Sequence, residues 1–368
     1  MERSTADVEK QTRPIQTVPT ALLPQECRTR TDVHISLVAP RPRLATATPT
    51  PRLAAPAGAL PKLHSLRSDI RETDMAIGIV LFNFTRSERV HTNYLTMRKN
   101  FSEFPVFTLE LVLNGQEPQI PGAIIVRTSS WMFHKERMCR VLETHIPHKY
   151  TKICFVDADI LFADPSWYWN VSIKLNTHHA VQPFEEAIWL EPDNRRITNR
   201  LESAGKHGAT EPFHPGFAWA FQRNWYCKYG YYDYAITGGG DAVSVAAWFR
   251  IRLSREICEF PTYKEFFERV GSVRHRISYV PGKVFHLWHG FPQNRQYRSR
   301  HAILRDVKDI RDIVRENSDG VYELTDRRIA SEMRTYFENR DDDGKKYQYD
   351  YPSDNRIGRY SWSRSALT

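Results

Sequence analysis

The stretch Phe155-Val156-Asp157-Ala158-Asp159-Ile160 places two carboxylates one residue apart, directly after an apolar run that begins at Ile153. Side chains alternate between the two faces of a strand, so we expect Asp157 and Asp159 to emerge on the same side of the chain. Hard divalent cations take oxygen ligands and commonly bind through one or two carboxylates together with substrate phosphates. The stretch therefore predicts a strand that ends in a metal site; the alternative is a surface turn with two solvated acids.

Apolar runs alternate with helical patterns on both sides of this stretch. The pattern predicts strands at residues 77–84, 106–112, 123–127 and 152–157, and helices at 86–101, 133–145, 241–249, 263–269, 301–317 and 325–340. Strands separated by helices indicate an α/β fold with a mostly parallel central sheet and helices on both of its faces. Ligands of such sheets bind beyond the carboxyl ends of the strands, and the two acids lie at one such end.

Three segments further along the chain add to the acidic motif. They are Phe213–Ala220 (FHPGFAWA), Gly238–Asp241 (GGGD) and His286–Gly290 (HLWHG), the last followed by Arg295, Arg298 and Arg300. Together with Asp157 and Asp159, this ordered set resembles the metal-dependent glycosyltransferases of the GT-A fold over about residues 77–343. The likeness is to soluble members from bacteria, phages and large DNA viruses, whose second half is similar to the galactosyltransferase C-terminal region. It implies a Rossmann-like domain that moves a sugar from a nucleotide-diphosphate sugar to a glycan or other hydroxyl acceptor.

The resemblance also implies a metal site with three protein ligands. Asp157 would contact the nucleotide and the metal, Asp159 would bind the metal directly, and a C-terminal histidine would be the third ligand. If residues 284–288 form a strand, His286 and His289 point to opposite faces, so we expect only His289, beside a predicted turn, to face the site. Two oxygen ligands and one nitrogen suit Mn²⁺ or Mg²⁺, and the nitrogen favours Mn²⁺. The alternative is that both histidines are packed or solvated.

Basic residues near these motifs are candidates for binding the donor. Arg295, Arg298 and Arg300 carry forked donors that match phosphate oxygens, so we expect them to bind the diphosphate. Lys135 and Arg137 resemble the basic residues that approach the nucleotide in similar enzymes. A solvated face at the start of a helix would explain the three arginines nearly as well.

Asp241 is the candidate for activating the acceptor. The segment that contains it resembles the Gly-rich acidic motif of inverting transferases, in which the acid takes the proton from the attacking hydroxyl. The preceding Gly239 and Gly240 would let a substrate approach the backbone closely. Asp241 has no adjacent Glu, so a helix cap is the alternative, and the anomeric outcome stays open. The other acceptor-side candidates are Trp219, as a platform for a sugar ring, and Glu185 and Glu186, as acceptors for hydroxyl groups.

Two other functions fit an Asp-x-Asp metal site. A nucleotidyl- or phosphotransferase can use the same pair of carboxylates, but it would make pyrophosphate or transfer phosphate instead of releasing a nucleoside diphosphate. A catalytically silent carbohydrate-binding protein can share the same fold.

Residues 1–74 differ from the rest of the chain in composition. They contain no Phe, Tyr or Trp and hold nine of the 22 prolines. Such a segment cannot bury enough apolar surface to offset its ordering entropy, so we expect it to be disordered. Translation that starts at Met75, immediately before the first predicted strand, explains this segment as well as a linker does. We then expect a GT-A domain over residues 75–304, a helical extension over 305–343 and a flexible tail over 344–368.

Charge, hydropathy and cysteine usage indicate which partners and which cellular compartment to expect. The net charge of +9 is spread along the chain, so specific nucleic-acid binding is not expected. No run approaches the roughly 18 to 20 apolar residues that cross a bilayer, so no transmembrane segment is expected. The five cysteines are odd in number and scattered, which favours a reducing compartment. We therefore expect a cytoplasmic protein, in the host cytoplasm if the protein is viral.

Overall fold

The computed structural model describes residues 74–208, 213–253, 255–291, 295 and 299–345. All of them belong to one compact unit, Asp69–Thr368. The segment 1–74 and the tail 344–368, for which we expect disorder, lie outside the described residues except at 74, 344 and 345.

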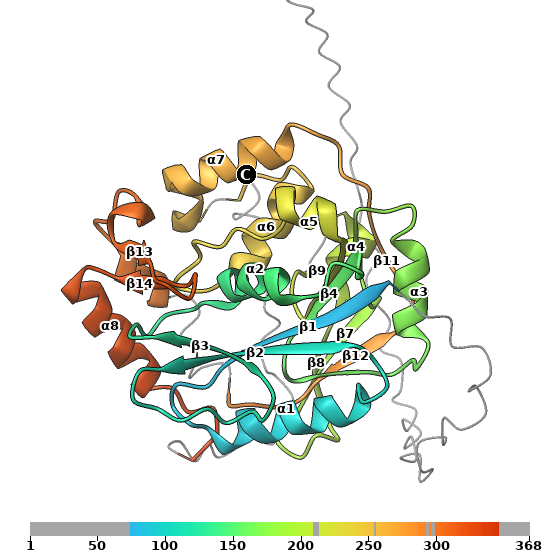
Figure 1. Cartoon of the computed structure of the whole chain (residues 1–368), viewed down its shortest axis with the longest axis horizontal. Coiled ribbons are helices and arrows are strands. Elements are labelled where there is room, and N and C mark those ends of the chain that lie inside the picture. Colours follow the sequence, from blue (N-terminus) through green and yellow to red (C-terminus); the bar gives the residue numbers. More distant parts are fainter. Residues whose placement is uncertain (1–73, 209–212, 254, 292–294, 296–298, 346–368) are drawn as a thin grey trace, which may run out of the picture. The chain divides into compact units, whose positions relative to one another are not determined.

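A seven-stranded sheet forms the centre of the described fold (Figure 1). Its strands, in spatial order, are β11 (Ile277–Tyr279), β6 (Ala180–Gln182), β10 (Ala218–Gln222), β4 (Lys152–Val156), β1 (Met75–Phe82), β2 (Val106–Leu113) and β3 (Ile124–Thr128). β1 pairs in parallel with β2 and β4, whereas β10 inserts antiparallel between β4 and β6. The predicted α/β class with a mostly parallel central sheet is therefore confirmed.

A second sheet of five strands begins where β4 ends. Its order is β5 (Ile160–Phe162), β12 (Lys283–His286), β7 (Glu186–Leu190), β8 (Ile197–Ser203) and β9 (Phe213–His214). The chain passes between the two sheets several times, and two of these passages form the site: the first crossing, residues 157–159 after β4, and the second crossing, residues 215–217 before β10. The Asp157 amide donates to the Phe217 carbonyl at 2.7 Å, so the two crossings lie side by side.

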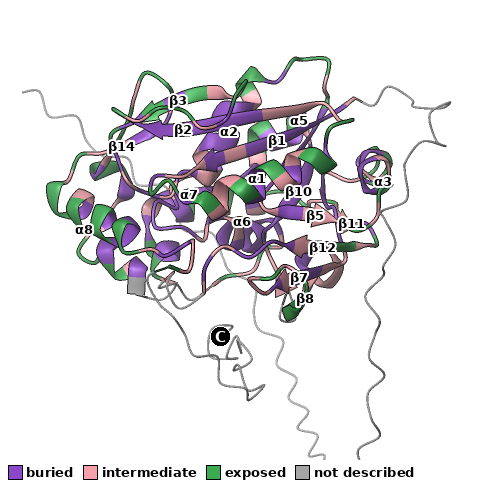
Figure 2. Ribbon diagram, turned by 90° about the horizontal axis from the view of Figure 1, so that it is seen from below, coloured by how far each residue is buried: buried purple, intermediate pink, exposed green. Residues whose placement is uncertain are grey.

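Helices cover both faces of the central sheet. They are α1 (Glu88–Asn100), α2 (Lys135–His145), α3 (Trp167–Lys174), α4 (Ala204–His207), α5 (Arg223–Tyr229), α6 (Gly240–Trp248), α7 (Pro261–Gly271) and α8 (Arg327–Glu338), with a 3-10 turn, η1, at Glu256–Glu259. α2, α5, α6, α7 and α8 share one apolar cluster, and α1 and α3 share the other with the smaller sheet. Along β1, Ala76 contributes to the first cluster, whereas Ile77 and Ile79, which point to the opposite face of the strand, contribute to the second. Figure 2 shows β1 and β2 mostly buried between these layers.

One predicted helix is wrong. In place of a helix over 301–317 the chain forms two short 3-10 helices and a strand hairpin, namely η3 (Ser299–Leu304), η4 (Ile310–Asp312), β13 (Val314–Glu316) and β14 (Tyr322–Leu324). Asp306 takes a left-handed backbone angle, φ 71°, which an α-helix does not tolerate. Asp309 then caps the second turn by accepting the amide of Arg311. The extension still packs into the apolar cluster of α2 and α6, through Ile310 and Tyr322.

Arg223 fixes the C-terminal end of α2, the helix whose first residue is Lys135. Arg223 is 8% exposed, and its guanidinium donates to the carbonyls of Glu143, Ile146 and Pro147 at 2.8, 2.9 and 2.9 Å. It also pairs with the Glu143 carboxylate at 2.6 Å. One side chain therefore binds several carbonyls at and beyond the end of the helix, where the regular backbone hydrogen bonds stop.

We expect Arg223→Met to lower the free energy of unfolding by about 3–5 kcal/mol, because the substitution removes the ion pair with the largely buried Glu143 carboxylate and the hydrogen bonds to three carbonyls. The matched control is Arg334→Met, since Arg334 is 64% exposed, its described ion pair is with Glu338 across one helical turn, and it lies 5.9 Å from the centre of the Trp131 ring. Its cost should stay below about 1 kcal/mol. Urea unfolding followed by circular dichroism measures both, and equal losses would contradict the role of Arg223.

His134 lies at the other end of α2 and is 2% exposed. Its ring packs edge-on against Phe82 and Phe84, with centroid distances of 6.5 and 6.2 Å. Burial lowers the pKa of His134 to about 4, although the Ser130 carbonyl opposes this shift. The folded protein therefore holds this imidazole neutral at a pH where an unfolded chain protonates it.

This difference predicts a pH dependence of stability. Between pH 6.5 and about 4 only the unfolded state takes up the proton, so stability should fall as pH falls through this window, by up to about 3 kcal/mol from His134. The His134→Gln variant loses this contribution and should show a shallower slope than the wild type. Unfolding free energies measured at intervals from pH 7 to 4 test the prediction, and parallel curves for the two proteins would refute it.

Candidate metal and active site

Asp159, His286 and His289 come together at the start of the smaller sheet. Asp159 belongs to the first crossing, and its Oδ2 atom is 2.9 Å from His289 Nε2 and 3.4 Å from His286 Nε2. The two Nε2 atoms are 3.2 Å apart. One ligand atom from each of the three residues lies within 4.8 Å of the others. A single cation can bridge such an arrangement.

Backbone pairing brings both histidines to Asp159. β12 pairs antiparallel with β5, so His286 lies opposite Ile160, and the Leu287 amide donates to the Asp159 carbonyl at 2.9 Å. The expectation that only His289 faces the site is corrected here, because β12 ends at His286 instead of continuing to residue 288. Strand alternation no longer applies beyond His286, so both rings reach the same carboxylate.

The Asp159 carboxylate is charged, and one of its oxygens is available to bind a cation. Burial by itself would raise its pKa, but the imidazoles of His286 and His289 outweigh burial and hold the pKa well below the usual value. Its Oδ1 atom is buried and has no hydrogen-bond partner among the described residues. A buried carboxylate oxygen without a partner is costly, and a cation held by Asp159 and both imidazoles would remove that cost. One oxygen with two nitrogens fits a divalent cation such as Mn²⁺ better than Mg²⁺.

A second charged group surrounds Lys135, the first residue of α2. The Lys135 ammonium is 2.8 and 3.0 Å from the two oxygens of Asp157 and 3.8 Å from Asp241 Oδ2. Burial raises the pKa of Asp157 to about 6, while Lys135 acts in the opposite direction. Because β4 ends at Val156, strand alternation does not govern the residues that follow it. Asp157 contacts Lys135, whereas Asp159 contacts His286 and His289.

Asp241 occupies the start of α6 and faces the second crossing. Its Oδ1 accepts the amide of Ala242 at 2.7 Å, whereas Oδ2 points toward Gly216. A Cβ on Gly216 would collide with this oxygen and would lie 3.5 Å from His214 Nε2. Burial would raise the pKa of Asp241, but Lys135 and His214 more than offset it and lower the pKa. Asp241 is therefore ionised at neutral pH.

His214 and Phe217 belong to the segment Phe213–Ala220 that the sequence pattern singled out, but neither was predicted as a site residue. The His214 Nε2 atom is buried without a hydrogen-bond partner among the described residues, and burial lowers the pKa of its imidazole to about 3. Phe217 has a left-handed φ of 71°, which is rare for a residue with a bulky side chain. Its ring stacks on His286 at 4.8 Å and lies 3.8 Å from the ring of His214. Only the packed structure reveals these contacts.

Glu136 is a further buried acid next to the site. It is 5% exposed, and its side chain lies so close to Gly240 that a Cβ there would collide with it. Burial raises the pKa of Glu136 to about 7, with Lys135 opposing the shift. Gly240 is thus needed for packing between α2 and α6, and Gly239 before it adopts a left-handed φ of 84°.

The predicted donor-binding basic residues separate into different places. Arg295 approaches His289, with Nη2 2.8 Å from both ring nitrogens and 3.0 Å from its carbonyl oxygen. Arg300 is buried with its guanidinium over the ring of Phe133, at 4.5 Å. Arg298 lies outside the described residues. Arg137 does not join Lys135, because it pairs with Asp233 and Glu316 and donates to the Gly320 carbonyl.

The predicted acceptor-side residues are also accounted for. Trp219 is 1% exposed and its indole donates to the Pro215 carbonyl, so no open ring face is available for a sugar. Glu185 pairs with Lys206 at 2.7 Å, and Glu186 pairs with Arg200 and Lys283 at 3.3 and 3.4 Å. Among the described contacts, neither glutamate reaches the Lys135 group or the Asp159 group.

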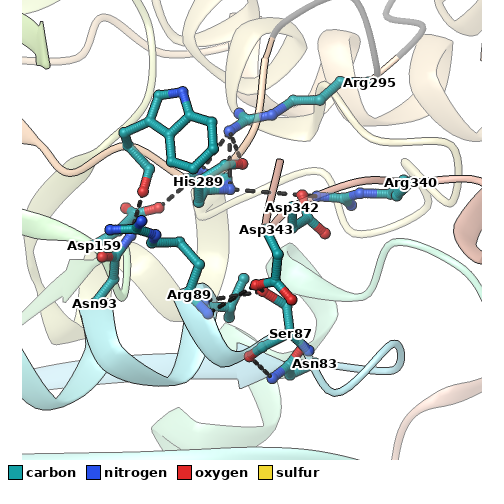
Figure 3. A network of polar contacts seen from close by, with 12 residues as sticks. Asn83, Ser87, Arg89, Asn93, Asp159, His289, Arg295, Arg340, Asp342 and Asp343 are labelled. Carbon is teal, nitrogen blue, oxygen red and sulfur yellow. Dashed lines mark hydrogen bonds and ion pairs between the residues drawn. The ribbon is translucent and has the colours of Figure 1, made fainter. Parts of the chain in front are cut away.

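A pocket opens at the junction of the two crossings. Lys135, Asp157, Gly216, Phe217 and Asp241 are among the residues that line it. Figure 3 shows the neighbouring network around Asp159 and His289, which continues through Asp342 to the C-terminal part of the described chain.

Within the part of the chain that the structure describes, none of the helices combines the length and apolar character required to span a membrane.

Comparison with known proteins gives a likeness at the level of structure only. No protein-family model matches the chain, and no curated protein matches it in sequence. One similar solved structure is glucosyl-3-phosphoglycerate synthase from Mycobacterium tuberculosis, determined with Mn²⁺, UDP and phosphoglyceric acid. It has 10% identity and a TM-score of 0.35, and the match covers 62% of this chain and 75% of that one.

Two further similar structures have the same low identity. β1,4-Galactosyltransferase 7 from Drosophila, determined with manganese, UDP-Gal and xylobiose, has 11% identity and a TM-score of 0.32, with 68% of this chain and 92% of that one covered. 4-Diphosphocytidyl-2C-methyl-D-erythritol synthase from Anaerococcus prevotii has 10% identity and a TM-score of 0.27, with 56% and 88% covered.

Proposed function

We propose that this protein is a metal-dependent glycosyltransferase that moves a sugar from a nucleotide-diphosphate sugar to a hydroxyl acceptor. The observation that carries the proposal is the group of Asp159, His286 and His289, with a buried carboxylate oxygen that has no partner among the described residues, beside a lysine that neutralises two further acids. The GT-A-like order of motifs in the sequence supports the same reading. We also propose residues 75–304 as the catalytic domain and 305–343 as its extension.

In this proposal Asp159, His286 and His289 hold Mn²⁺, or Mg²⁺ in its place. The bound ion would neutralise the charge that develops on the diphosphate as it leaves. Asp157 remains a candidate for contact with the nucleotide side of the donor and with the metal, since its pKa of about 6 leaves it mostly ionised at neutral pH. Arg295, beside His289, is the described arginine best placed to donate to diphosphate oxygens.

Asp241 is proposed to accept the proton of the acceptor hydroxyl. As this proton transfers to Oδ2, the hydroxyl oxygen forms its bond to the anomeric carbon, and the bond from that carbon to the diphosphate breaks. Lys135 supports this role by keeping Asp241 ionised, and the absence of a side chain at Gly216 leaves Oδ2 open on that side. Asp241 also accepts the Ala242 amide through Oδ1, which leaves Oδ2 for the substrate.

The activity test is a panel of nucleotide-diphosphate sugars incubated with the protein and Mn²⁺, with and without simple sugar acceptors. Release of a nucleoside diphosphate, including slow donor hydrolysis, supports the proposal. Release of pyrophosphate or transfer of phosphate would identify a nucleotidyl- or phosphotransferase instead. Saturable sugar binding without any turnover would identify a silent carbohydrate-binding protein.

The metal ligands can be tested without a known donor. Asp159→Asn should abolish Mn²⁺ binding measured by calorimetry, and His286→Ala and His289→Ala should each weaken it strongly, because both rings face the same oxygen. Asp233→Asn, which removes a carboxylate paired with Arg137 and Arg140, is the control and should leave Mn²⁺ affinity unchanged. Retained binding in Asp159→Asn would rule out this metal site.

The proposed role of Asp241 as the base can be tested separately from donor binding. Asp241→Asn keeps the shape of the side chain but cannot accept a proton, so the turnover number should fall by roughly 10²- to 10⁴-fold. The affinity for the donor should hardly change, because proton acceptance contributes only in the transition state. Steady-state kinetics with a donor identified from the panel measure both quantities. Near wild-type turnover would show that Asp241 is a helix cap and that another residue is the base.

A further inference from the structure

The segment Arg340–Lys345, which follows α8, lies against the loop that carries His289; we refer to it as the C-terminal strap. It is tied to the start of α1, far away in the sequence. Asp343 accepts hydrogen bonds from the Ser87 hydroxyl at 2.6 Å and the Arg89 amide at 2.9 Å. Lys345 pairs with Glu88 at 3.1 Å. The strap is therefore held at a defined position beside the metal site (Figure 3).

Two glycines, Gly290 and Gly344, allow the strap and the loop that carries His289 to approach each other closely. A Cβ on Gly290 would lie 2.5 Å from the Asp341 carbonyl oxygen, and a Cβ on Gly344 would lie 2.5 Å from the indole of Trp288. Both glycines have positive φ angles, 89° and 68°. Trp288 is held in turn, because its carbonyl accepts the side-chain amide of Asn93 at 3.0 Å. The residues on both sides of His289 are thus packed against the strap or against α1.

Asp342 is the strap residue that approaches the metal site. It is 9% exposed, and its Oδ1 atom is 2.8 Å from the Arg340 guanidinium and 3.8 Å from His289 Nδ1. The other nitrogen of the same ring, Nε2, is 2.9 Å from Asp159. The imidazole of His289 therefore has a carboxylate on the side of each nitrogen: Asp159 is within hydrogen-bond distance of Nε2, whereas Asp342 is at ion-pair distance from Nδ1.

Metal binding imposes a proton arrangement on this ring. If Nε2 of His289 is a ligand, its lone pair is used, and the proton of the neutral imidazole must be on Nδ1. A ligating histidine usually directs that N–H at a carboxylate or carbonyl, which fixes the ring and raises its basicity as a ligand. Asp342 is the described carboxylate on the Nδ1 side. Arg295 is also close to the ring: its Nη2 atom is 2.8 Å from both ring nitrogens and 3.0 Å from the His289 carbonyl. A guanidinium can only donate, so once the ring nitrogens hold a proton and a cation, the carbonyl is the acceptor left to Arg295.

We propose that Asp342 is a positioning residue for the metal centre: it favours the Nδ1-protonated form of His289 and turns Nε2 toward the cation shared with Asp159 and His286. This inference rests on the proposed metal site and adds to it a residue from the C-terminal strap. The competing interpretation is that Asp342 only pairs with Arg340 to hold the strap in place.

The test uses full-length protein and Mn²⁺ alone as the probe, with the free-ion electron paramagnetic resonance signal measured during titration. Asp342→Asn should weaken Mn²⁺ binding by about 10- to 100-fold, the loss usual for an outer carboxylate behind a metal-bound histidine. Asp342→Glu, which restores the negative charge, should recover most of the affinity. Asp343→Asn is the matched control, because it loosens the same strap without a described contact to His289.

The outcomes separate the two interpretations. Equal losses of affinity in Asp342→Asn and Asp343→Asn, or unchanged affinity in Asp342→Asn, would overturn the positioning role. So would a failure of Asp342→Glu to recover affinity while the protein remains folded by circular dichroism. If the wild type binds Mn²⁺ no better than Asp159→Asn, the metal site itself fails and this inference fails with it. A loss confined to Asp342→Asn, with Asp343→Asn like the wild type, supports the proposal.

Discussion

The charge of Lys135 is the constraint on which the site depends. Two carboxylates from different elements, Asp157 after β4 and Asp241 at the start of α6, face the same ammonium group. Without a cation between them, partly buried like charges would repel one another or take up protons. Lys135 is the first residue of α2, so the position of this charge depends on how the helix is anchored. Arg223 and His134 provide that anchoring at the two ends of α2, through buried hydrogen bonds and aromatic packing.

The two groups of charged residues are adjacent because two of the passages between the sheets lie side by side. Residues 157–159 lead from the large sheet to the small one, and residues 215–217 lead back. Asp157 and Asp159 stand at opposite ends of the first crossing, so one belongs to the lysine group and the other to the histidine group. Phe217 ends the second crossing, where its strained backbone accepts the Asp157 amide and its ring packs on His286. A single residue thus contacts both groups.

The C-terminal part of the described chain contributes to the same region from a third direction. The strap lies against the loop of His289 and is tied to Ser87 and Arg89, so the proposed metal ligands are enclosed by segments from the start, middle and end of the fold. Such enclosure limits the access of water to the histidine ring and strengthens the electrostatic interactions around it. The hairpin of β13 and β14 and the helix α8 place the strap there by packing into the same apolar cluster as α2 and α6.

The sequence by itself determined four strands of the central sheet, five of the six predicted helices and the identity of several chemical groups, but it did not predict β6, β10, β11 or most of the smaller sheet. Strand and helix periodicity are local properties, so the four predicted strands and most of the helices follow from the pattern of apolar residues alone. The acidic pair, the glycine-rich segment and the two histidines are recognisable for the same reason.

Tertiary structure alone decided which groups meet. It ended β4 at Val156 and β12 at His286, where sheet pairing stops, and this placed Asp159 with both histidines and Asp157 with Lys135. It buried Trp219, directed Arg137 to Asp233 and brought Asp342 to His289 across a long separation in sequence. Contacts of this kind depend on the packing of distant segments, which local residue patterns do not encode.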